Sequence, residues 1–348
     1  MNISNYFTMP SAMPNGRRAG LDGGRQPSVT SLIIACCAVV AMIFATQGAV
    51  ADEGGVSFWL PGQQGSFAAV QSDPGWSLPL IYYHANADAD RSRPLTIGEQ
   101  VAAGVKAQTD LLMAAPTYVF SSPVAGAQAS IGVTALLGRA DVSTDTTLSG
   151  PGGGTLSRNQ NDSRTGVGDL YPTASLKWNS DAHNYLAYTM AGVPVGAYDQ
   201  GRLANLGTNH WSLDVGGGYT YFDPVKGHEA SAVVGFTYNW RNPDTDYKNG
   251  INGHLDWAAS QFLSEQFHIG LVGYFYRQLT GDSGSGAVLG DFKSQVSAVG
   301  PQAGYFFKVG DQQWYLNLKG YHEFDAKHRL EGWNMWLTLA IPLGPGNQ

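Results

Sequence analysis

The feature that most constrains the fold is a side-chain pattern that repeats every two residues after position 51. In residues 211–222, one face carries Trp211, Leu213, Val215, Gly217, Tyr219 and Tyr221, and the other carries Ser212, Asp214, Gly216, Gly218 and Thr220. Residues 169–179, 229–240 and 314–323 show the same alternation. A period of two is that of a β-strand with two different faces, and aromatic residues at the ends of the apolar faces are typical of a membrane interface. The pattern therefore predicts strands that face lipid on one side.

Twelve such segments are expected, and the links between them differ in length. The strands are predicted near residues 76–86, 101–120, 127–142, 167–179, 183–198, 211–222, 229–240, 253–262, 266–279, 294–307, 313–324 and 333–343. The second segment contains Pro116, so it is either one strand or a strand plus a piece of loop. Links after odd-numbered strands, such as 143–166, are all longer than links after even-numbered strands, such as 180–182, which is the arrangement of outer-membrane barrels. The sequence therefore predicts an all-β, transmembrane antiparallel β-barrel of about twelve strands, with fourteen as the alternative, that encloses a cavity.

Composition excludes several other classes of protein. Only 14% of the residues are charged, against about 25% in an ordinary soluble domain, while the chain has 45 glycines and 11% aromatic residues. No stretch after Ala51 approaches 18 uninterrupted apolar residues, so a helical membrane protein is not expected. The net charge of −7 argues against a nucleic-acid partner, because phosphate binding requires a basic surface.

The N-terminus has the organisation of a secretory signal peptide. Arg17, Arg18 and Arg25 precede an apolar run at 32–45, and small residues at 49–51 allow cleavage before Asp52. The run is shorter than the roughly 20 residues that a spanning helix needs. An uncleaved anchor and a lipoprotein box at Cys36 are the alternatives. We therefore predict that residues 1–51 are a cleaved signal peptide for export to the bacterial outer membrane, and that both cysteines are removed with it.

The segment between the predicted signal peptide and the first strand has a different character. Residues 52–75 contain Pro61-Gly62 and Pro74-Gly75 and lack clean alternation. We expect them to fold into the barrel mouth as a small plug, with the barrel itself formed by residues 76–344.

Polar side chains on the face opposite the apolar one are expected to line the lumen. By parity these are Lys106, Gln108, Asp110, Asp169, Lys177, Asp214, Glu229, His254, Asp256, Lys319, Tyr321 and Glu323. A lumen with both signs of charge suits a selective channel or a substrate path. The alternative is that these charges pair across the cavity and keep it in shape.

Two short strings resemble functional motifs of other proteins. Gly281-Asp282-Ser283-Gly284 matches the string around a serine-protease nucleophile, but it lies in a glycine-rich link with none of the surrounding protease sequence. Residues 244–250 resemble a fragment of a calcium loop that lacks the terminal glutamate. No dinucleotide, phosphate-loop or zinc motif is present in the sequence. We therefore expect no catalytic residue, metal or cofactor.

Several further motifs resemble one known family over nearly the whole chain after residue 51. They are Gly54-Gly55-Val56-Ser57-Phe58-Trp59-Leu60-Pro61-Gly62, Gly168-Asp169-Leu170-Tyr171-Pro172 with Leu176-Lys177-Trp178, Gly192-Val193-Pro194-Val195-Gly196-Ala197-Tyr198, Gly281-Asp282-Ser283-Gly284-Ser285-Gly286-Ala287, Val299-Gly300-Pro301-Gln302-Ala303-Gly304-Tyr305 and Trp336-Leu337-Thr338-Leu339-Ala340-Ile341-Pro342-Leu343. In these motifs the chain resembles the "MetA-pathway of phenol degradation" or SphA-type outer-membrane transporters, which are related to the long-chain fatty-acid transporter barrels.

The resemblance implies a function and a set of partners. The expected activity is passive uptake of small hydrophobic or aromatic compounds, such as phenol-like or fatty-acid-like molecules. The expected partners are outer-membrane lipid, the small ligand and the barrel-insertion machinery. A structural or adhesive barrel is the alternative, followed by a barrel-embedded lipid hydrolase.

Overall fold

A computed structural model describes residues 57–89, 95–97, 100–102, 104–149, 155–288 and 293–344 of the chain. The predicted signal peptide, residues 1–51, and the first residues of the predicted plug, 52–56, lie outside the described residues. Within the described ranges, no helix is both long and apolar enough to cross a membrane.

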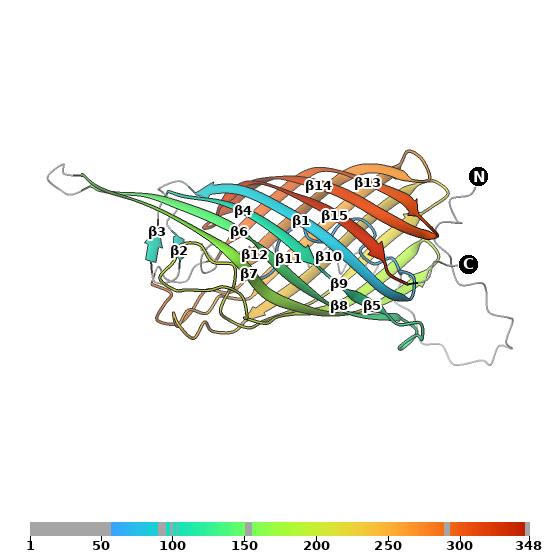
Figure 1. The fold of residues 1–348 in the computed structure, drawn as a ribbon, viewed down its shortest axis with the longest axis horizontal. Helices are drawn as coiled ribbons and strands as arrows, with labels where there is room; N and C mark the ends of the chain where they lie inside the picture. Colours follow the sequence, from blue (N-terminus) through green and yellow to red (C-terminus); the bar gives the residue numbers. More distant parts are fainter. Residues whose placement is uncertain are drawn as a thin grey trace. The chain divides into compact units, whose positions relative to one another are not determined.

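The described residues form one closed antiparallel sheet and one small hairpin (Figure 1). The strands are β1 (Gly75–Ala89), β2 (Leu95–Ile97), β3 (Gln100–Ala102), β4 (Val105–Ala114), β5 (Thr117–Val119), β6 (Gln128–Ser149), β7 (Thr155–Ser180), β8 (His183–Gly192), β9 (Ser212–Asp223), β10 (His228–Asn239), β11 (Asn252–Phe262), β12 (Phe267–Gln278), β13 (Gln295–Val309), β14 (Gln312–Lys327) and β15 (Glu331–Pro342). Each main strand pairs with its sequence neighbour, and β15 pairs with β1 from Pro342 opposite Ser77 to Glu331 opposite Asp88. This pairing closes the sheet, so the predicted twelve-strand antiparallel barrel is confirmed.

One extra strand arises at the proline in the second predicted segment. β4 and β5 both lie between β1 and β6, one after the other. Pro116 separates them because it has no N–H group to donate to the ladder. The carbonyl of Pro116 still accepts a hydrogen bond from Val133 N at 3.1 Å, which keeps the chain in line across the break.

The predicted link 143–166 is wrong, because pairing continues through it. β6 and β7 pair as far as Ser149 opposite Thr155. The extension is rich in Ser, Thr, Asn, Asp and Arg and has no apolar face, so hydrophobic alternation could not reveal it, whereas backbone pairing does not depend on side-chain polarity. We call the end of the barrel to which this hairpin points the loop end, and the opposite end, where β1 begins and β15 finishes, the turn end.

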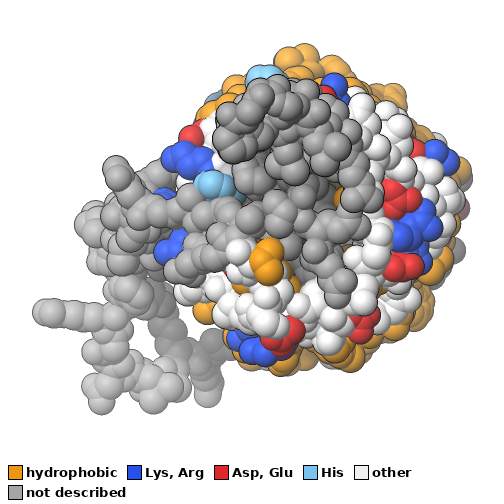
Figure 2. Space-filling view, turned by 90° about the vertical axis from the view of Figure 1, so that its left-hand side faces the viewer, with side chains coloured by type: hydrophobic (Ala, Val, Ile, Leu, Met, Phe, Trp, Pro, Cys, Tyr) orange, Lys and Arg blue, Asp and Glu red, His pale blue; other side chains and the backbone are white. Residues whose placement is uncertain are grey.

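The outer surface of the barrel is apolar. Large exposed hydrophobic side chains on it include Leu112, Ile131, Val133, Leu137, Leu213, Val215, Phe236, Ile269, Leu271, Val299, Leu316, Leu318 and Leu337. Exposed tryptophans lie near both ends of this surface, with Trp76 at the turn end and Trp211, Trp240 and Trp333 at the loop end. In the view onto one end, hydrophobic side chains lie along the upper, right and lower edges, and most charged side chains on this face lie inside those edges (Figure 2). This distribution is the one expected of a barrel surrounded by lipid.

The inner face carries buried aromatic and polar side chains. Trp336, Tyr274, Tyr276 and Tyr321 are buried in one cluster together with Leu111 and Met113 from β4. The lumen therefore contains much aromatic surface in addition to the charged groups expected from the sequence.

Candidate substrate path in the barrel lumen

Of the twelve residues expected in the lumen, nine lie on the inner face. They are Asp169, Lys177, Asp214, Glu229, His254, Asp256, Lys319, Tyr321 and Glu323. All nine hydrogen-bond to other parts of the chain, so the geometry agrees with the alternative in which these groups keep the lumen in shape.

The prediction that Lys106, Gln108 and Asp110 face the lumen is wrong. On β4 the alternate residues Leu111 and Met113 are buried inside, whereas Leu112 is 48% exposed on the outside. The Asp110 carboxylate accepts hydrogen bonds on the outer face from the Tyr82 hydroxyl at 2.6 Å and contacts His84 Nδ1 at 2.7 Å. Polar residues must face inward only where the outer face contacts acyl chains. This part of β4 lies beyond Leu112, towards the loop end, so polar side chains can face outward there.

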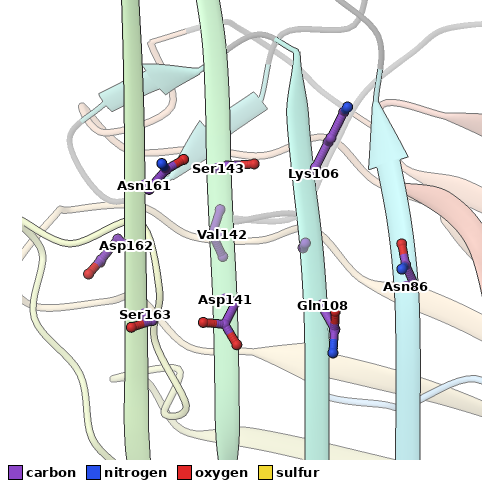
Figure 3. A pocket seen from close by; sticks show the side chains of 10 residues that line it. Asn86, Lys106, Gln108, Asp141, Val142, Ser143, Asn161, Asp162 and Ser163 are labelled. Atoms are coloured by element: carbon purple, nitrogen blue, oxygen red, sulfur yellow. The ribbon is translucent and has the colours of Figure 1, made fainter.

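Two of these outward polar residues, Lys106 and Gln108, border a hollow in the described surface. It has a volume of about 500 Å³ and is lined by Asn86, Lys106, Ala107, Gln108, Asp141, Val142, Ser143, Asn161, Asp162 and Ser163. Figure 3 shows these residues on four adjacent strands, β1, β4, β6 and β7. Lys106 pairs with Ser143 and Gln108 with Asp141, so these lining residues share the outward face of the sheet, and the hollow lies outside the lumen.

Residues 57–74, which we call the N-terminal segment, are bound by the inner face of the barrel through their main chain. Asp256 on β11 accepts hydrogen bonds from Gly62 N at 3.0 Å and Gln64 N at 3.1 Å. The Lys319 ammonium on β14 donates to the carbonyls of Gly62 at 2.6 Å, Gln63 at 3.2 Å and Gln64 at 3.0 Å. One carboxylate and one ammonium group thus satisfy five backbone groups of a single turn.

The conformation of this turn requires a glycine. Gly62 has a φ of +84°, a region that residues with a Cβ rarely adopt. A Cβ at this position would also lie 2.9 Å from the Tyr321 ring, whose hydroxyl donates to the Gly62 carbonyl. The Pro61-Gly62 pair in the sequence is therefore explained by the close approach of the segment to β14.

Two further wall residues bind the segment closer to the turn end. Glu229 on β10 accepts hydrogen bonds from the Ser66 hydroxyl at 2.6 Å and from Phe67 N at 3.1 Å. Lys177 on β7 donates to the Val70 carbonyl at 2.8 Å. The segment is therefore bound to opposite sides of the barrel along most of its length.

A buried network binds the beginning of the segment. Asp214 is fully buried, and it accepts hydrogen bonds from the Tyr188 hydroxyl at 2.7 Å and the Thr237 hydroxyl at 2.6 Å. Its other near neighbour is His254, whose Nε2 lies 3.1 Å from the carboxylate. The Trp59 ring stacks on the His254 ring with 3.6 Å between their centroids. The sequence did not predict these roles. Trp59 lies outside every predicted strand, and although Tyr188 lies within the predicted strand 183–198, strand alternation does not show which residue across the lumen it will contact.

The remaining two lumen carboxylates bind neighbouring backbone. Asp169 accepts hydrogen bonds from Gly196 N, Thr208 N and the Thr208 hydroxyl, each at 2.8 Å, and so binds the link between β8 and β9 to the wall. Glu323 accepts from the Tyr274 hydroxyl at 2.6 Å and Gly332 N at 2.9 Å.

The protease-like string at Gly281 joins two links at the loop end. Asp282 is buried and accepts hydrogen bonds from the Tyr247 hydroxyl, Gly250 N and Gln278 Nε2. Ser283 pairs through its main chain with Lys248. These contacts give the string a structural explanation: it connects the β10–β11 link to the β12–β13 link.

A second carboxylate strengthens the same connection. Asp246 accepts hydrogen bonds from the Ser285 hydroxyl and from Ser285 N, and it contacts Arg241 at 2.5 Å. Hydrogen bonds from Ser285, together with the charge of Arg241, lower the pKa of the Asp246 carboxyl to about 2. The described residues contain no group of three or more acidic, histidine or cysteine side chains arranged to hold a metal ion.

The turn end of the lumen holds a cluster of aromatic rings around one residue of the N-terminal segment. The Phe67 ring lies 5.4 to 6.1 Å, between centroids, from five rings of the wall. These rings belong to Phe222, Phe262, His268, Phe306 and Tyr315. The sequence pattern offered one sign of this cluster, since Phe222, Phe262 and Phe306 occupy inward positions close to the ends of their strands.

The barrel is similar to solved outer-membrane proteins. An outer membrane channel from Pseudomonas putida F1 is 16% identical and superimposes with a TM-score of 0.60, covering 79% of this chain and 98% of that chain. A FadL homologue from Pseudomonas aeruginosa is 11% identical with a TM-score of 0.40, covering 76% and 89%. The translocator domain of the autotransporter NalP from Neisseria meningitidis is 10% identical with a TM-score of 0.46, covering 79% and 91%. The first of these shows that the chain has the fold of an outer-membrane channel.

The family follows from the sequence as well as from the fold. Among curated proteins, no sequence matches the chain. The model of one protein family, however, matches residues 89–339, more than two thirds of the chain. This match confirms the resemblance seen in the motifs, and the chain belongs to the family described as putative MetA-pathway of phenol degradation.

Proposed function

We propose that the chain is an outer-membrane channel for the passive uptake of small hydrophobic or aromatic molecules. The observation that carries the proposal is the closed barrel with an apolar outer surface and an inner face rich in aromatic rings. An apolar exterior suits lipid, and aromatic rings inside give a ring-shaped or oily solute favourable contacts without a fixed hydrogen-bond pattern. The family to which the chain belongs and the channel fold support the same proposal.

The proposed path runs along the nine inward residues and requires movement of the N-terminal segment. The main chain of the N-terminal segment is hydrogen-bonded to the side chains of Asp256, Lys319, Glu229 and Lys177, so these side chains are not free to bind a solute. We propose that the segment acts as a plug that closes the lumen in the state described, and that solute passes when it is displaced. The proposed driving force for this passage is the concentration gradient of the solute.

The proposed route to the membrane begins with residues 1–51. They act as the cleaved signal peptide, and the barrel-insertion machinery then places the mature chain in the outer membrane. Gel mobility of outer-membrane fractions with and without heating tests this placement, because a closed barrel resists unheated detergent.

The decisive experiment measures transport. Purified protein is reconstituted into liposomes, and the entry of phenol, benzoate and a medium-chain fatty acid is compared with that of glucose. The expected result is faster entry of the hydrophobic or aromatic solutes than in empty liposomes, with no gain for glucose. A chain shortened by removal of residues 57–72 supplies the plug test, since its conductance in a planar bilayer is expected to exceed that of the full chain. Equal entry of all solutes with and without protein would refute uptake, and unchanged conductance would refute the plug.

A further inference from the structure

The aromatic cluster at the turn end has the geometry of a binding site that is already filled. We call its five wall rings, Phe222, Phe262, His268, Phe306 and Tyr315, the aromatic cage. They come from five different strands, β9 and β11 to β14. Each lies at an angle of 61° to 90° to the Phe67 ring, which is the edge-to-face arrangement that aromatic pairs favour.

The occupant differs from the cage in origin and in backbone conformation. Phe67 belongs to the N-terminal segment, not to the wall, and its φ is +64°. A residue with a Cβ is strained in this region, and such strain persists only where the surroundings impose it. Glu229 supplies the constraint, because its carboxylate binds both Phe67 N and the Ser66 hydroxyl. The wall thus holds a strained residue with its ring inside the cage.

The cage also has a polar group that its present occupant does not use. His268 is completely buried, and its Nε2 lies 3.0 Å from the Tyr315 hydroxyl. Its Nδ1 is buried with no hydrogen-bond partner among the described residues. A buried nitrogen of this kind is costly unless something else binds it, and a benzyl side chain has no atom that can. A ring that bears a hydroxyl group has one.

We propose that the aromatic cage is a binding site for a single aromatic ring of the transported molecule, in particular a hydroxylated ring, and that Phe67 occupies it as an internal substitute until a ligand displaces it. The proposal rests on the proposed function, since it names the site and the ligand class of the same lumen. Exchange of one ring for another preserves the edge-to-face contacts with the wall, and it releases the backbone strain at Phe67. The cage accommodates one six-membered ring in the space that the Phe67 side chain now fills.

Removal of the internal substitute tests the proposal. When a site is open for only a fraction of the time, the apparent dissociation constant of a ligand rises by the inverse of that fraction. The full-length protein in detergent is titrated with phenol by calorimetry, with cyclohexanol as the non-aromatic ligand of the same size. The Phe67→Ala variant is expected to bind phenol about tenfold more tightly than the unsubstituted protein, as for a cage that is vacant about a tenth of the time. Cyclohexanol is expected to gain less.

Three further variants test whether the gain in phenol affinity arises in the cage. Phe306→Ala in the Phe67→Ala background removes one cage wall and is expected to abolish the gain. His268→Phe in the same background keeps the cage aromatic and is expected to weaken phenol binding while leaving benzene binding unchanged. Phe236→Ala alters an exposed phenylalanine on the outer face and is expected to change nothing. Heat-modifiable gel mobility checks that each variant forms the barrel.

The possible results separate failure of the cage from failure of the proposed function. Equal phenol affinity with and without Phe67 overturns the proposed binding site, and so does an equal gain in affinity for cyclohexanol. Transport is then judged separately, from the uptake of phenol into liposomes by the unsubstituted protein. A tenfold gain in binding with no uptake in liposomes supports the cage and refutes transport. If Phe67→Ala does not form a barrel, Phe67→Gly, which also vacates the cage and suits the φ of +64° at this position, is titrated in its place and is subject to the same criteria.

Discussion

Lys319 is the residue whose loss is expected to weaken the docking of the N-terminal segment most. Its ammonium group is buried and donates to three carbonyls, those of Gly62, Gln63 and Gln64. A hydrogen bond that involves a charged group contributes about 1.5 to 3 kcal/mol net. Three bonds that share one ammonium are not additive, so we take about 3 kcal/mol for Lys319→Met. This value lowers the docking equilibrium constant roughly a hundredfold.

The rate at which a thiol in the segment reacts with a reagent from solution reports this change. A single cysteine is introduced as Gln64→Cys, with Cys36 and Cys37 replaced by alanine, and its reaction with a polyethylene-glycol maleimide is followed on gels. While the segment is mostly docked, the rate is proportional to the undocked fraction, so Lys319→Met is expected to accelerate labelling roughly a hundredfold. Lys308→Met, at an exposed lysine on β13, is the matched control and is expected to leave the rate unchanged. Labelling rates that agree within about twofold for the two backgrounds would refute the reasoning.

Three other predictions concern the loops and the outer surface. Asp282→Ala is expected to make the links at the loop end sensitive to added protease, because three donors lose their acceptor, whereas Ser283→Ala is expected to leave both protease resistance and any lipase background unchanged. Val215→Arg, on the outer face, is expected to lower the free energy of unfolding in vesicles by about 2 to 4 kcal/mol, measured by urea titration. Val225→Arg, in an exposed turn, is the control and is expected to leave the free energy of unfolding unchanged. The pKa of Asp246 is lowered to about 2 from 3.8. Its stabilisation of the loop connection is therefore fully present above pH 4 and is lost as the pH falls towards 2. Hydrogen exchange of the loop amides measures this loss, and faster exchange already at pH 5 would contradict the prediction.

The fold was predictable from the sequence because two independent patterns specify it. Alternation fixes which side chains face lipid, and Gly, Pro, Asn and Asp clusters mark where strands end. In β9 and β10 both faces were predicted correctly, as the burial of Asp214 and the exposure of Val215 show. The prediction failed where the strands leave the apolar surface, as in 143–149 and 155–166, because there alternation no longer distinguishes strand from loop.

The candidate site was predictable only in part. Parity identified Asp256 and Lys319 as inward residues, but their partners are separated from them by 194 and 257 residues in the sequence. Nothing in an irregular segment such as 57–74 indicates which wall residue it will contact. For Asp110 the predicted face itself was wrong. Its charge suggested that it lines the lumen, whereas on the outer face its carboxylate is hydrogen-bonded to Tyr82 and His84.

The hydrogen bonds between the wall and the N-terminal segment determine which positions of the segment tolerate substitution. Asp256, Lys319 and Lys177 bind amide and carbonyl groups, which every amino acid except proline provides in full. A library randomised at Gln63, Gln64 and Val70 should therefore retain most of its members in the docked form. A library randomised at the three wall positions should retain few, so at these contacts docking depends on the side chains of the barrel and not on those of the segment.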